Sequence, residues 1–398
     1  MTDDMKNRQK KISEIAFSCF YLAVIIEVLL VIIDKSAYVN PLEGTLFRLT
    51  FVLCLVKAVL TKYSWKEYTV LALLLGMGII SYYVTDKNDI IRITVFLAAC
   101  KEINMKKCMK LVFVLTLAGC VSIIFLSLMG IGGTISVVQD YGRGAVETRY
   151  TLGMGHPNAL QCMVWALTAL GLYLFADKIN WILYVVIFGI NVFFFSLTNS
   201  KTGLLAGIFT ILCFFAASHI KTTLTARLFS AGNICVCMLS IIGSVVIAKD
   251  AMCLWNYYVE GIYDRKVEFY IPLDGFLTGR IGSLIETRGH EGVMDTWSLF
   301  GREGNHSYYF DMGWVRLFYW YGVIPALVAI VILFVLLFYF YRKRKLLEIV
   351  MISAFSLYSV IEAHAVSVYL ARNYVLFIVG MYWWRLFASE RNIQSSEV

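Results

Sequence analysis

The sequence predicts an all-α polytopic integral membrane protein with about twelve transmembrane helices. Of its 398 residues, 60% are hydrophobic and 16% are charged, and the mean hydropathy is +0.73. Soluble domains are about 45–50% apolar and about 25% charged. The apolar residues also fall into runs near the roughly 20 residues that cross a bilayer core. This composition excludes a water-soluble enzyme, a DNA-binding protein and a secreted disulfide scaffold.

The apolar runs define the helices in order along the chain. The first run is too long for a removable signal peptide and lacks a small-residue cleavage site, so we interpret it as a membrane span. The fourth run is short and contains Arg92, which makes it the weakest span. The predicted spans are residues 13–33, 45–61, 68–85, 90–104, 109–130, 158–176, 180–198, 202–219, 228–248, 316–340, 347–369 and 372–388.

The positions of Lys and Arg predict that both termini are cytoplasmic. Short cytoplasmic loops of membrane proteins carry an excess of these residues. If the N-terminus is inside, the inner segments hold more than half of the 35 basic residues. The net charge of +8 is then an orientation signal, and nucleic acid is not an expected partner. The inner basic residues are Lys6, Arg8, Lys10, Lys11, Lys62, Lys66, Lys101, Lys106, Lys107, Lys110, Lys178, Lys221, Arg227, Arg342, Lys343, Arg344, Lys345, Arg385 and Arg391.

Two long segments, 131–157 and 249–315, fall on the outer face of the predicted single transmembrane domain 1–398. Structureless loops longer than about 15 residues are uncommon and usually functional. We expect short amphipathic helices in 249–315, which contains six basic and ten acidic residues. An anion bound there must be held by particular arginines, because guanidinium groups suit bidentate contact with phosphate.

Three arginines of these segments are candidate anion ligands. Arg280 follows a glycine turn, and Arg143 lies between two glycines, so a ligand could approach the backbone closely. Arg149 follows six residues later on the same face. The alternative interpretation is that all three are solvated loop charges.

Four further residues could carry chemistry. Lys201 begins a predicted helix, and a helix N-terminus beside a lysine is suited to an anion; a snorkelling lysine is the alternative. His156, just before the sixth span, is a candidate ligand or proton carrier, or else an interface residue. His306 is the candidate base and Asp311 could orient it. On spacing alone, the last two could equally be solvated loop residues.

Several other patterns bear on function. We find no Walker A loop, no pair of aspartates two apart for a metal–nucleotide sugar and no zinc-protease helix motif, so neither a metal nor a cofactor is expected. Glu362 and His364 could couple protons or pack helices. A transporter would need charges inside the bundle, and an acyl or glycosyl transferase could use a carboxylate of the first outer loop. The residues to test for these are Glu27, Arg48 and Lys57, and Asp34 and Glu43.

The layout and four short motifs resemble the bacterial O-antigen polymerase and ligase superfamily. The layout is many spans with one large late outer loop. The resemblance covers most of the chain in layout, and the order and sidedness of the motifs carry it. The motifs are Gly155-His156-Pro157-Asn158, Asn199-Ser200-Lys201-Thr202-Gly203-Leu204-Leu205, Thr278-Gly279-Arg280, and the stretch from Asp311 through Tyr321-Gly322-Val323-Ile324.

The resemblance implies metal-independent, inverting transfer of a glycan carried on polyprenyl pyrophosphate, at the outer face of the bacterial cytoplasmic membrane. It implies a lipid-linked glycan donor and acceptor, membrane lipids, and a flippase and a chain-length regulator as partners. By the same resemblance His306 is the base, and Arg280 and Arg149 bind the pyrophosphate. The second choices for that role are Arg143 and Arg288. Separately from the resemblance, His156, Arg302 and Arg316 are further candidate site residues without an assigned role.

The sequence departs from the family in two places. Lys201 stands where the family often has arginine, and Met312 follows Asp311 where asparagine is common. The expected function is a glycan polymerase. A ligase that moves finished glycan to its final acceptor, and a lipid-linked glycan flippase or transporter with a dispensable outer loop, are the alternatives.

Overall fold

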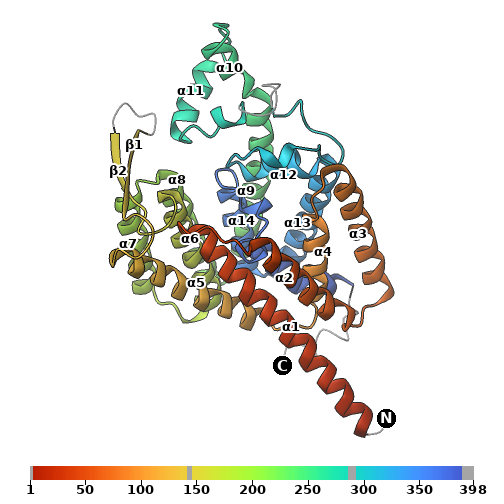
Figure 1. The fold of residues 1–398 in the computed structure, drawn as a ribbon. Helices are drawn as coiled ribbons and strands as arrows, with labels where there is room; N and C mark the ends of the chain where they lie inside the picture. The colour runs from red at the N-terminus through yellow and green to blue at the C-terminus, as the bar shows by residue number, and fades with distance from the viewer. Residues whose placement is uncertain (1–2, 141–145, 286–292, 388–398) are drawn as a thin grey trace. The chain divides into compact units, whose positions relative to one another are not determined.

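The computed structural model describes residues 3–140, 146–285 and 293–387 (Figure 1). Eight helices of this part of the chain are long and apolar enough to cross a membrane. This agrees with the predicted class, an all-α membrane protein. The helices form two compact units: the first comprises Met1–Tyr82, Lys87–Ser122 and Val368–Val398, and the second comprises Tyr83–Asp86 and Ile123–Ser367.

The first unit is built on α1, which packs along α2, while α2 packs along α4. Phe96 of α4 stacks on Phe20 of α1 and meets Phe377 of α15 edge-on, so the chain's last apolar helix completes this core. Its elements are α1 (Asp3–Lys35), α2 (Glu43–Val59), α3 (Trp65–Thr85), α4 (Asp89–Ala99), α5 (Met105–Leu128), η6 (Leu370–Arg372), α15 (Tyr374–Tyr382) and η7 (Trp383–Leu386); α3 and α5 end in the second unit.

A buried ion pair joins four elements of the first unit. Glu27 of α1 accepts hydrogen bonds from Arg92 Nη2 of α4 at 3.1 Å and from Thr50 Oγ1 of α2 at 2.7 Å. The backbone N–H of Leu370 in η6 donates to the other carboxylate oxygen at 3.0 Å. A buried carboxylate with three donors is a satisfied structural group rather than an open ion site.

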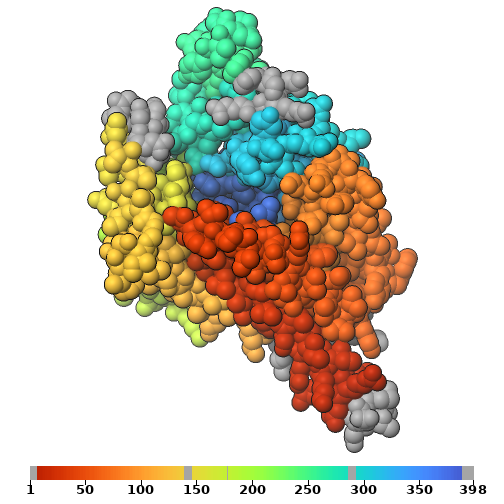
Figure 2. Space-filling model, viewed as in Figure 1, coloured from red at the N-terminus to blue at the C-terminus, as the bar shows by residue number. Residues whose placement is uncertain are grey.

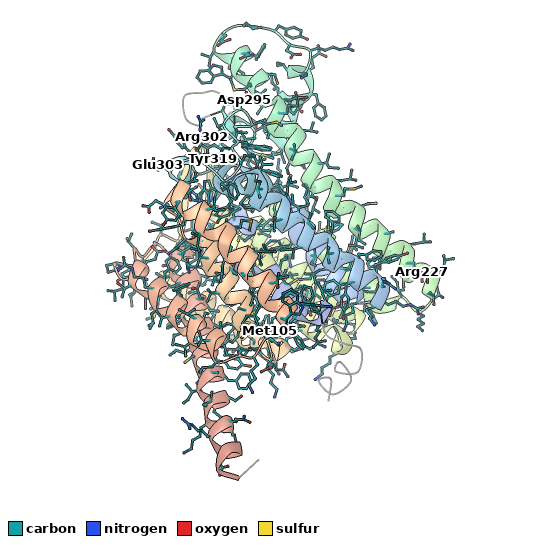
Figure 3. All side chains as sticks on the ribbon, turned by 90° about the vertical axis from the view of Figure 1, so that its right-hand side faces the viewer. Met105, Arg227, Asp295, Arg302, Glu303 and Tyr319 are labelled. Atoms are coloured by element: carbon teal, nitrogen blue, oxygen red, sulfur yellow. The ribbon has the colours of Figure 1, made fainter. Side chains whose placement is uncertain are left out.

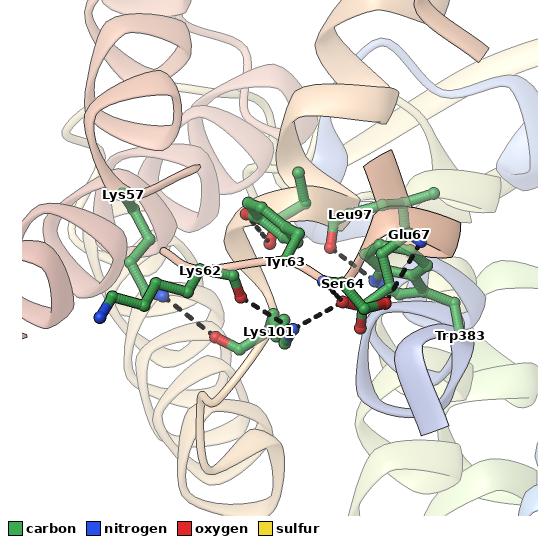
Figure 4. Close-up of polar contacts among 9 residues, drawn as sticks. Lys57, Lys62, Tyr63, Ser64, Glu67, Leu97, Lys101 and Trp383 are labelled. Atoms are coloured by element: carbon green, nitrogen blue, oxygen red, sulfur yellow. Dashed lines mark hydrogen bonds and ion pairs between the residues drawn. The ribbon is translucent and has the colours of Figure 1, made fainter. Parts of the chain in front are cut away.

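Lysines form a second polar network in the first unit, where α2 ends and α4 ends (Figure 4). Lys57 Nζ donates to the backbone carbonyl of Lys101 at 3.0 Å. Lys101 Nζ in turn donates to the carbonyl of Lys62 and to Glu67 Oε2, both at 2.8 Å. The Lys57 ammonium thus connects α2 to the chain after α4, and the Lys101 ammonium connects that chain to α3 and to the loop before it.

The second unit has α6, α8, α9 and α14 at its centre, and α7 packs on α6 and α8. Trp165 of α6 lies 4.3 Å from the ring of Tyr358 of α14, between centroids. Its elements are β1 (Ser136–Asp140), β2 (Val146–Tyr150), α6 (Pro157–Phe175), η1 (Ala176–Lys178), α7 (Trp181–Thr198), α8 (Lys201–His219), α9 (Thr223–Asp250), α10 (Met252–Tyr258), α11 (Val267–Phe276), η2 (Gly282–Leu284), η4 (Asn305–Ser307), α12 (Gly313–Tyr321), α13 (Val323–Lys343), α14 (Leu346–Tyr358) and η5 (Ala363–Val366).

The described residues of the segment 249–315, which are 249–285 and 293–315, lie at one end of the second unit (Figure 1). The 28 residues of α9 span about 42 Å at 1.5 Å per residue, more than the roughly 30 Å of a bilayer core. The segment α10–α11 projects beyond the rest of this unit (Figure 2). Arg227 near the start of α9 lies at the opposite end from Arg302 and Glu303 (Figure 3).

Each predicted span contains a helix, but four of these helices are short: α2, α4, α14 and α15. The prediction of one continuous helix over 347–369 is wrong, because α14 ends at Tyr358. The chain then turns, and the carbonyl of Ser359 accepts a hydrogen bond from the backbone N–H of Trp314 at 3.3 Å. The span predicted at 316–340 is likewise broken at Gly322, between α12 and α13.

The break at Gly322 requires glycine. Its φ is +90°, and a Cβ added there would lie 2.3 Å from the backbone nitrogen of Gly301. We expect Gly322→Ala to lower the free energy of unfolding by about 1–3 kcal/mol, the usual range for local backbone strain. Unfolding midpoints of the purified protein would measure this. Gly189→Ala in α7, where nothing lies within 4 Å, is the control, and equal midpoints for the two variants would contradict the expectation.

Candidate functional site

A hairpin holds the first candidate arginine. Strands β1 and β2 pair antiparallel, with Val137 opposite Arg149. Residues two apart in a strand share a face, so Glu147 Oε2 accepts from Arg149 Nε at 2.9 Å and from Nη2 at 2.7 Å. The same oxygen accepts from Asn199 Nδ2 at 2.9 Å. Arg149, only 2% exposed, is therefore fixed at the turn between α7 and α8; Lys201, the first residue of α8, is exposed.

A tight loop after α11 holds Arg280. Thr278 and Gly279 both have positive φ, 63° and 77°. Asp274 Oδ1 accepts from the backbone N–H groups of Ile281 at 2.7 Å and Gly282 at 3.1 Å, which closes the loop. This arrangement turns the Arg280 side chain inward.

The Arg280 guanidinium is 5% exposed and donates in three directions. Nε donates to the carbonyl of Ile361 at 2.6 Å, and Nη1 donates to the carbonyl of Leu277 at 2.8 Å. Nη2 donates to Glu362 Oε1 at 3.1 Å and forms a longer ion pair with Asp311 at 3.7 Å. The Asp311 side chain is 52% exposed, so the exposed carboxylate marks the side from which a ligand could reach this cation.

The ion pair between Arg280 and Glu362 depends on where α14 ends. A Cβ on Gly313 would lie 2.7 Å from the carbonyl oxygen of Glu362, so glycine lets the start of α12 pack directly on the chain after α14. Trp314 Nε1 also donates to the carbonyl of Ser356 at 2.9 Å. The break in the predicted span thereby brings Glu362 to Arg280.

His156 lies at the start of α6. It caps α6, and its Nδ1 accepts from the backbone N–H of Asn158 at 3.1 Å. Partial desolvation of the ring lowers the pKa of His156, the charge of Asp311 raises it, and the charges of Arg149 and Arg280 lower it. Hydrogen bonds bring both arginines near the first turns of α6. Thr198, next to the Asn199 that contacts Glu147, donates through Oγ1 to Gln161 Oε1 at 3.1 Å. His364, two residues after Glu362, has its Nε2 3.2 Å from Cys162 Sγ. We call this group the arginine cluster: Glu147, Arg149, His156, Arg280, Asp311 and Glu362.

His306, the candidate base, is held on α12 by aromatic contacts. Its ring stacks on Trp320 at 4.9 Å and lies 5.8 Å from Tyr321, between centroids, and the residue is 8% exposed. The neighbouring Asn305 Nδ2 donates to the carbonyl of Tyr319 at 2.8 Å. The ion pair of Asp311 is with Arg280, so its role in orienting His306 stays a prediction.

Of the remaining candidates, Arg316 contacts the same Trp320 ring as His306. Arg316 is buried on α12, where it donates to the carbonyl of Phe310 and lies over the ring of Trp320 at 4.8 Å. Arg302 is exposed. Arg143 and Arg288 lie outside the described residues. Among the described residues, no group of three or more His, Cys, Asp or Glu side chains could hold a metal ion.

The charged residues considered for a transporter or another transferase lie in the first unit. Glu27 and Lys57 belong to the two networks described above, and Arg48 is exposed. Asp34 pairs with Lys35 at 2.7 Å, and Glu43 accepts from the hydroxyl of Tyr369.

Two residues of the arginine cluster were not recognised as site residues from the sequence. Glu147 lies two residues before Arg149, a spacing that is informative only once the segment is known to be a strand. Glu362 was considered for proton coupling, but its pairing with Arg280, 82 positions away in the chain, has no local signal. Comparisons with known proteins give no match, whether to a family model, a curated protein or a solved structure.

Proposed function

We propose that this protein is a membrane polymerase that joins polyprenyl-pyrophosphate-linked oligosaccharide repeats into a surface polysaccharide. The observation that carries the proposal is that two buried arginines, Arg149 and Arg280, are held by segments that contact the first turns of α6, where His156 is the N-cap. Both guanidinium groups are buried, at 2% and 5% exposure, and they come from two segments about 130 residues apart in the chain. A buried guanidinium group is costly to keep, and these two lie in the long polar segments 131–157 and 249–315.

The proposed site lies at the outer face of the bacterial cytoplasmic membrane. The distribution of Lys and Arg supports cytoplasmic termini and twelve spans, with 131–157 and 249–315 outside. The lipid part of the donor stays in the bilayer, so a site at the ends of helices, rather than in a separate soluble domain, suits this substrate.

In the proposed reaction, the acceptor hydroxyl attacks the anomeric carbon of the donor from the face opposite the pyrophosphate. The new carbon–oxygen bond forms as the bond to the pyrophosphate oxygen breaks, and that oxygen takes the electron pair. His306 takes the hydroxyl proton. Arg149 and Arg280 stabilise the negative charge that develops on the leaving pyrophosphate, as fixed cations at a low-dielectric boundary do. The anomeric configuration is inverted.

The test compares surface glycan on gels from a strain that lacks the gene and carries wild type, Arg149→Ala or His306→Ala. We expect a ladder of chain lengths with wild type and single repeats with either variant, at matched membrane expression. Arg227→Ala, an exposed arginine at the other end of the second unit, is the control and should give a normal ladder. Normal ladders in both site variants would overturn the site assignment.

Two outcomes of the deletion itself identify the alternatives. Long lipid-linked chains that never reach their final acceptor would identify a ligase. Loss of all outer glycan, single repeats included, with full rescue by both site variants, would identify a flippase. A ligase uses the same donor chemistry, so its site residues would be the same.

A further inference from the structure

His156 is fixed in one tautomer by its own helix. Its Nδ1 accepts the hydrogen bond from Asn158 N at 3.1 Å, in the first turn of α6. A ring nitrogen that accepts a hydrogen bond does not carry the proton of the neutral imidazole. The neutral ring therefore has its proton on Nε2, the nitrogen on the far side from the cap. The ring keeps an exposed surface, so a ligand can reach it.

Partial burial and the surrounding charges together favour the neutral form of His156. Arg149 comes from β2, Arg280 from the loop after α11, and Asp311 from the segment before α12. The ring also stands at the positive end of the α6 dipole, which opposes a second proton. Partial desolvation of the ring lowers the pKa of His156, the charge of Asp311 raises it, and the charges of Arg149 and Arg280 lower it, and the net result is a lowered pKa. Protonation of Nδ1 would in addition place two N–H groups against each other at the cap.

We infer that His156 is a third ligand of the anion bound by Arg149 and Arg280, and that it donates to a phosphate oxygen through Nε2 as a neutral imidazole. The inference rests on the proposed function and adds a ligand to its pyrophosphate site. A histidine at a helix N-terminus, kept neutral, can donate to a developing negative charge without giving up its proton. His156 is then distinct in chemistry from His306, which takes a proton in the proposed reaction.

The tautomer is tested by nitrogen NMR of the purified full chain in detergent, with ring-labelled histidine. The chain has five histidines, and the signal lost in His156→Asn identifies the ring. Asparagine is a good N-cap, so this variant keeps the cap of α6. At about pH 6.5, the ordinary pKa of histidine, we expect a neutral ring with Nε2 protonated. An imidazolium or an Nδ1-protonated ring at that pH would overturn the inference.

Binding is tested with inorganic pyrophosphate as the probe. We expect pyrophosphate to shift the His156 Nε2 signal of wild type, and its Kd to rise about tenfold in His156→Asn, as for loss of one hydrogen bond to a charged group. His219→Asn, an exposed histidine at the last residue of α8, is the matched control and should bind as wild type. Arg280→Lys should also weaken binding.

The outcomes separate this inference from the proposed function. Weaker binding in Arg280→Lys together with unchanged binding in His156→Asn would overturn the role of His156 alone, and the pyrophosphate site would stand. If wild type does not bind pyrophosphate, both the proposed pyrophosphate site and the role of His156 in it are overturned. Weaker binding in both variants, with an unchanged His219→Asn control, would support both.

Discussion

Arg280→Ala is expected to abolish long glycan chains and to destabilise the second unit. Loss of one fixed donor to a developing negative charge typically costs about 2.7–4 kcal/mol of transition-state stabilisation. Loss of the guanidinium also removes the ion pair with Glu362, whose side chain is 12% exposed. Removal of one member of a buried ion pair costs about 3–5 kcal/mol of stability. Glycan ladders and unfolding midpoints would measure the two effects.

A double variant separates the effect of Arg280 on glycan length from its effect on stability. Arg280→Met/Glu362→Met removes both charges and fills the space, so we expect it to recover most of the lost stability. It should still fail to make long chains, because the cation is absent. A normal ladder from the stable double variant would show that Arg280 only holds the fold together. Glu362→Gln, which keeps an acceptor for Arg280, should be milder than Arg280→Ala in both measurements.

Arg92→Leu is expected to destabilise the first unit by about 3–5 kcal/mol, because it leaves Glu27 charged and buried without its cation. The Glu27 side chain is 3% exposed and would keep only the donors Thr50 and Leu370 N. The measurement is the unfolding midpoint of the purified variant, together with its yield in membranes. Arg48→Leu, which removes an exposed arginine of α2, is the control and should leave the midpoint near that of wild type.

The charge-free double variant Glu27→Leu/Arg92→Leu tests whether the pair has a transport role. A structural pair can be replaced by apolar side chains of similar volume with little loss of stability. We therefore expect the double variant to be more stable than Arg92→Leu and to make a normal ladder. A stable double variant that leaves all glycan on the inner face would instead support a transporter that uses Glu27.

The class of protein and the positions of most helices could be predicted because membrane spans are local features. A run of about 20 apolar residues is recognisable without knowing its neighbours, as for α5 and α13. The runs at 90–104 and 347–369 were also predicted to be spans, yet α4 has 11 residues and α14 has 13. An apolar segment must be buried away from water. Inside the unit it is buried equally well as a helix or as a turn, so its composition does not decide between the two.

The candidate cations could be predicted in part for a similar reason. Glycines beside Arg143 and Arg280, and the position of Arg149 in a long polar segment, are visible in the sequence. The hairpin β1–β2 was not predicted, because its ten residues are a small part of an otherwise helical chain. Without the hairpin, nothing in the sequence indicates that Glu147 and Arg149 share a face.

The sequence by itself determined that the chain is a helical membrane protein with arginines and histidines in two long polar segments. Composition and the length of apolar runs depend only on residues that are adjacent in the chain, so both can be determined without the tertiary structure. Only the tertiary structure decided that Arg149 and Arg280 act on one imidazole, and that Glu362 holds Arg280. These pairings join segments far apart in the chain, and they depend on where α14 ends and how closely Gly313 packs.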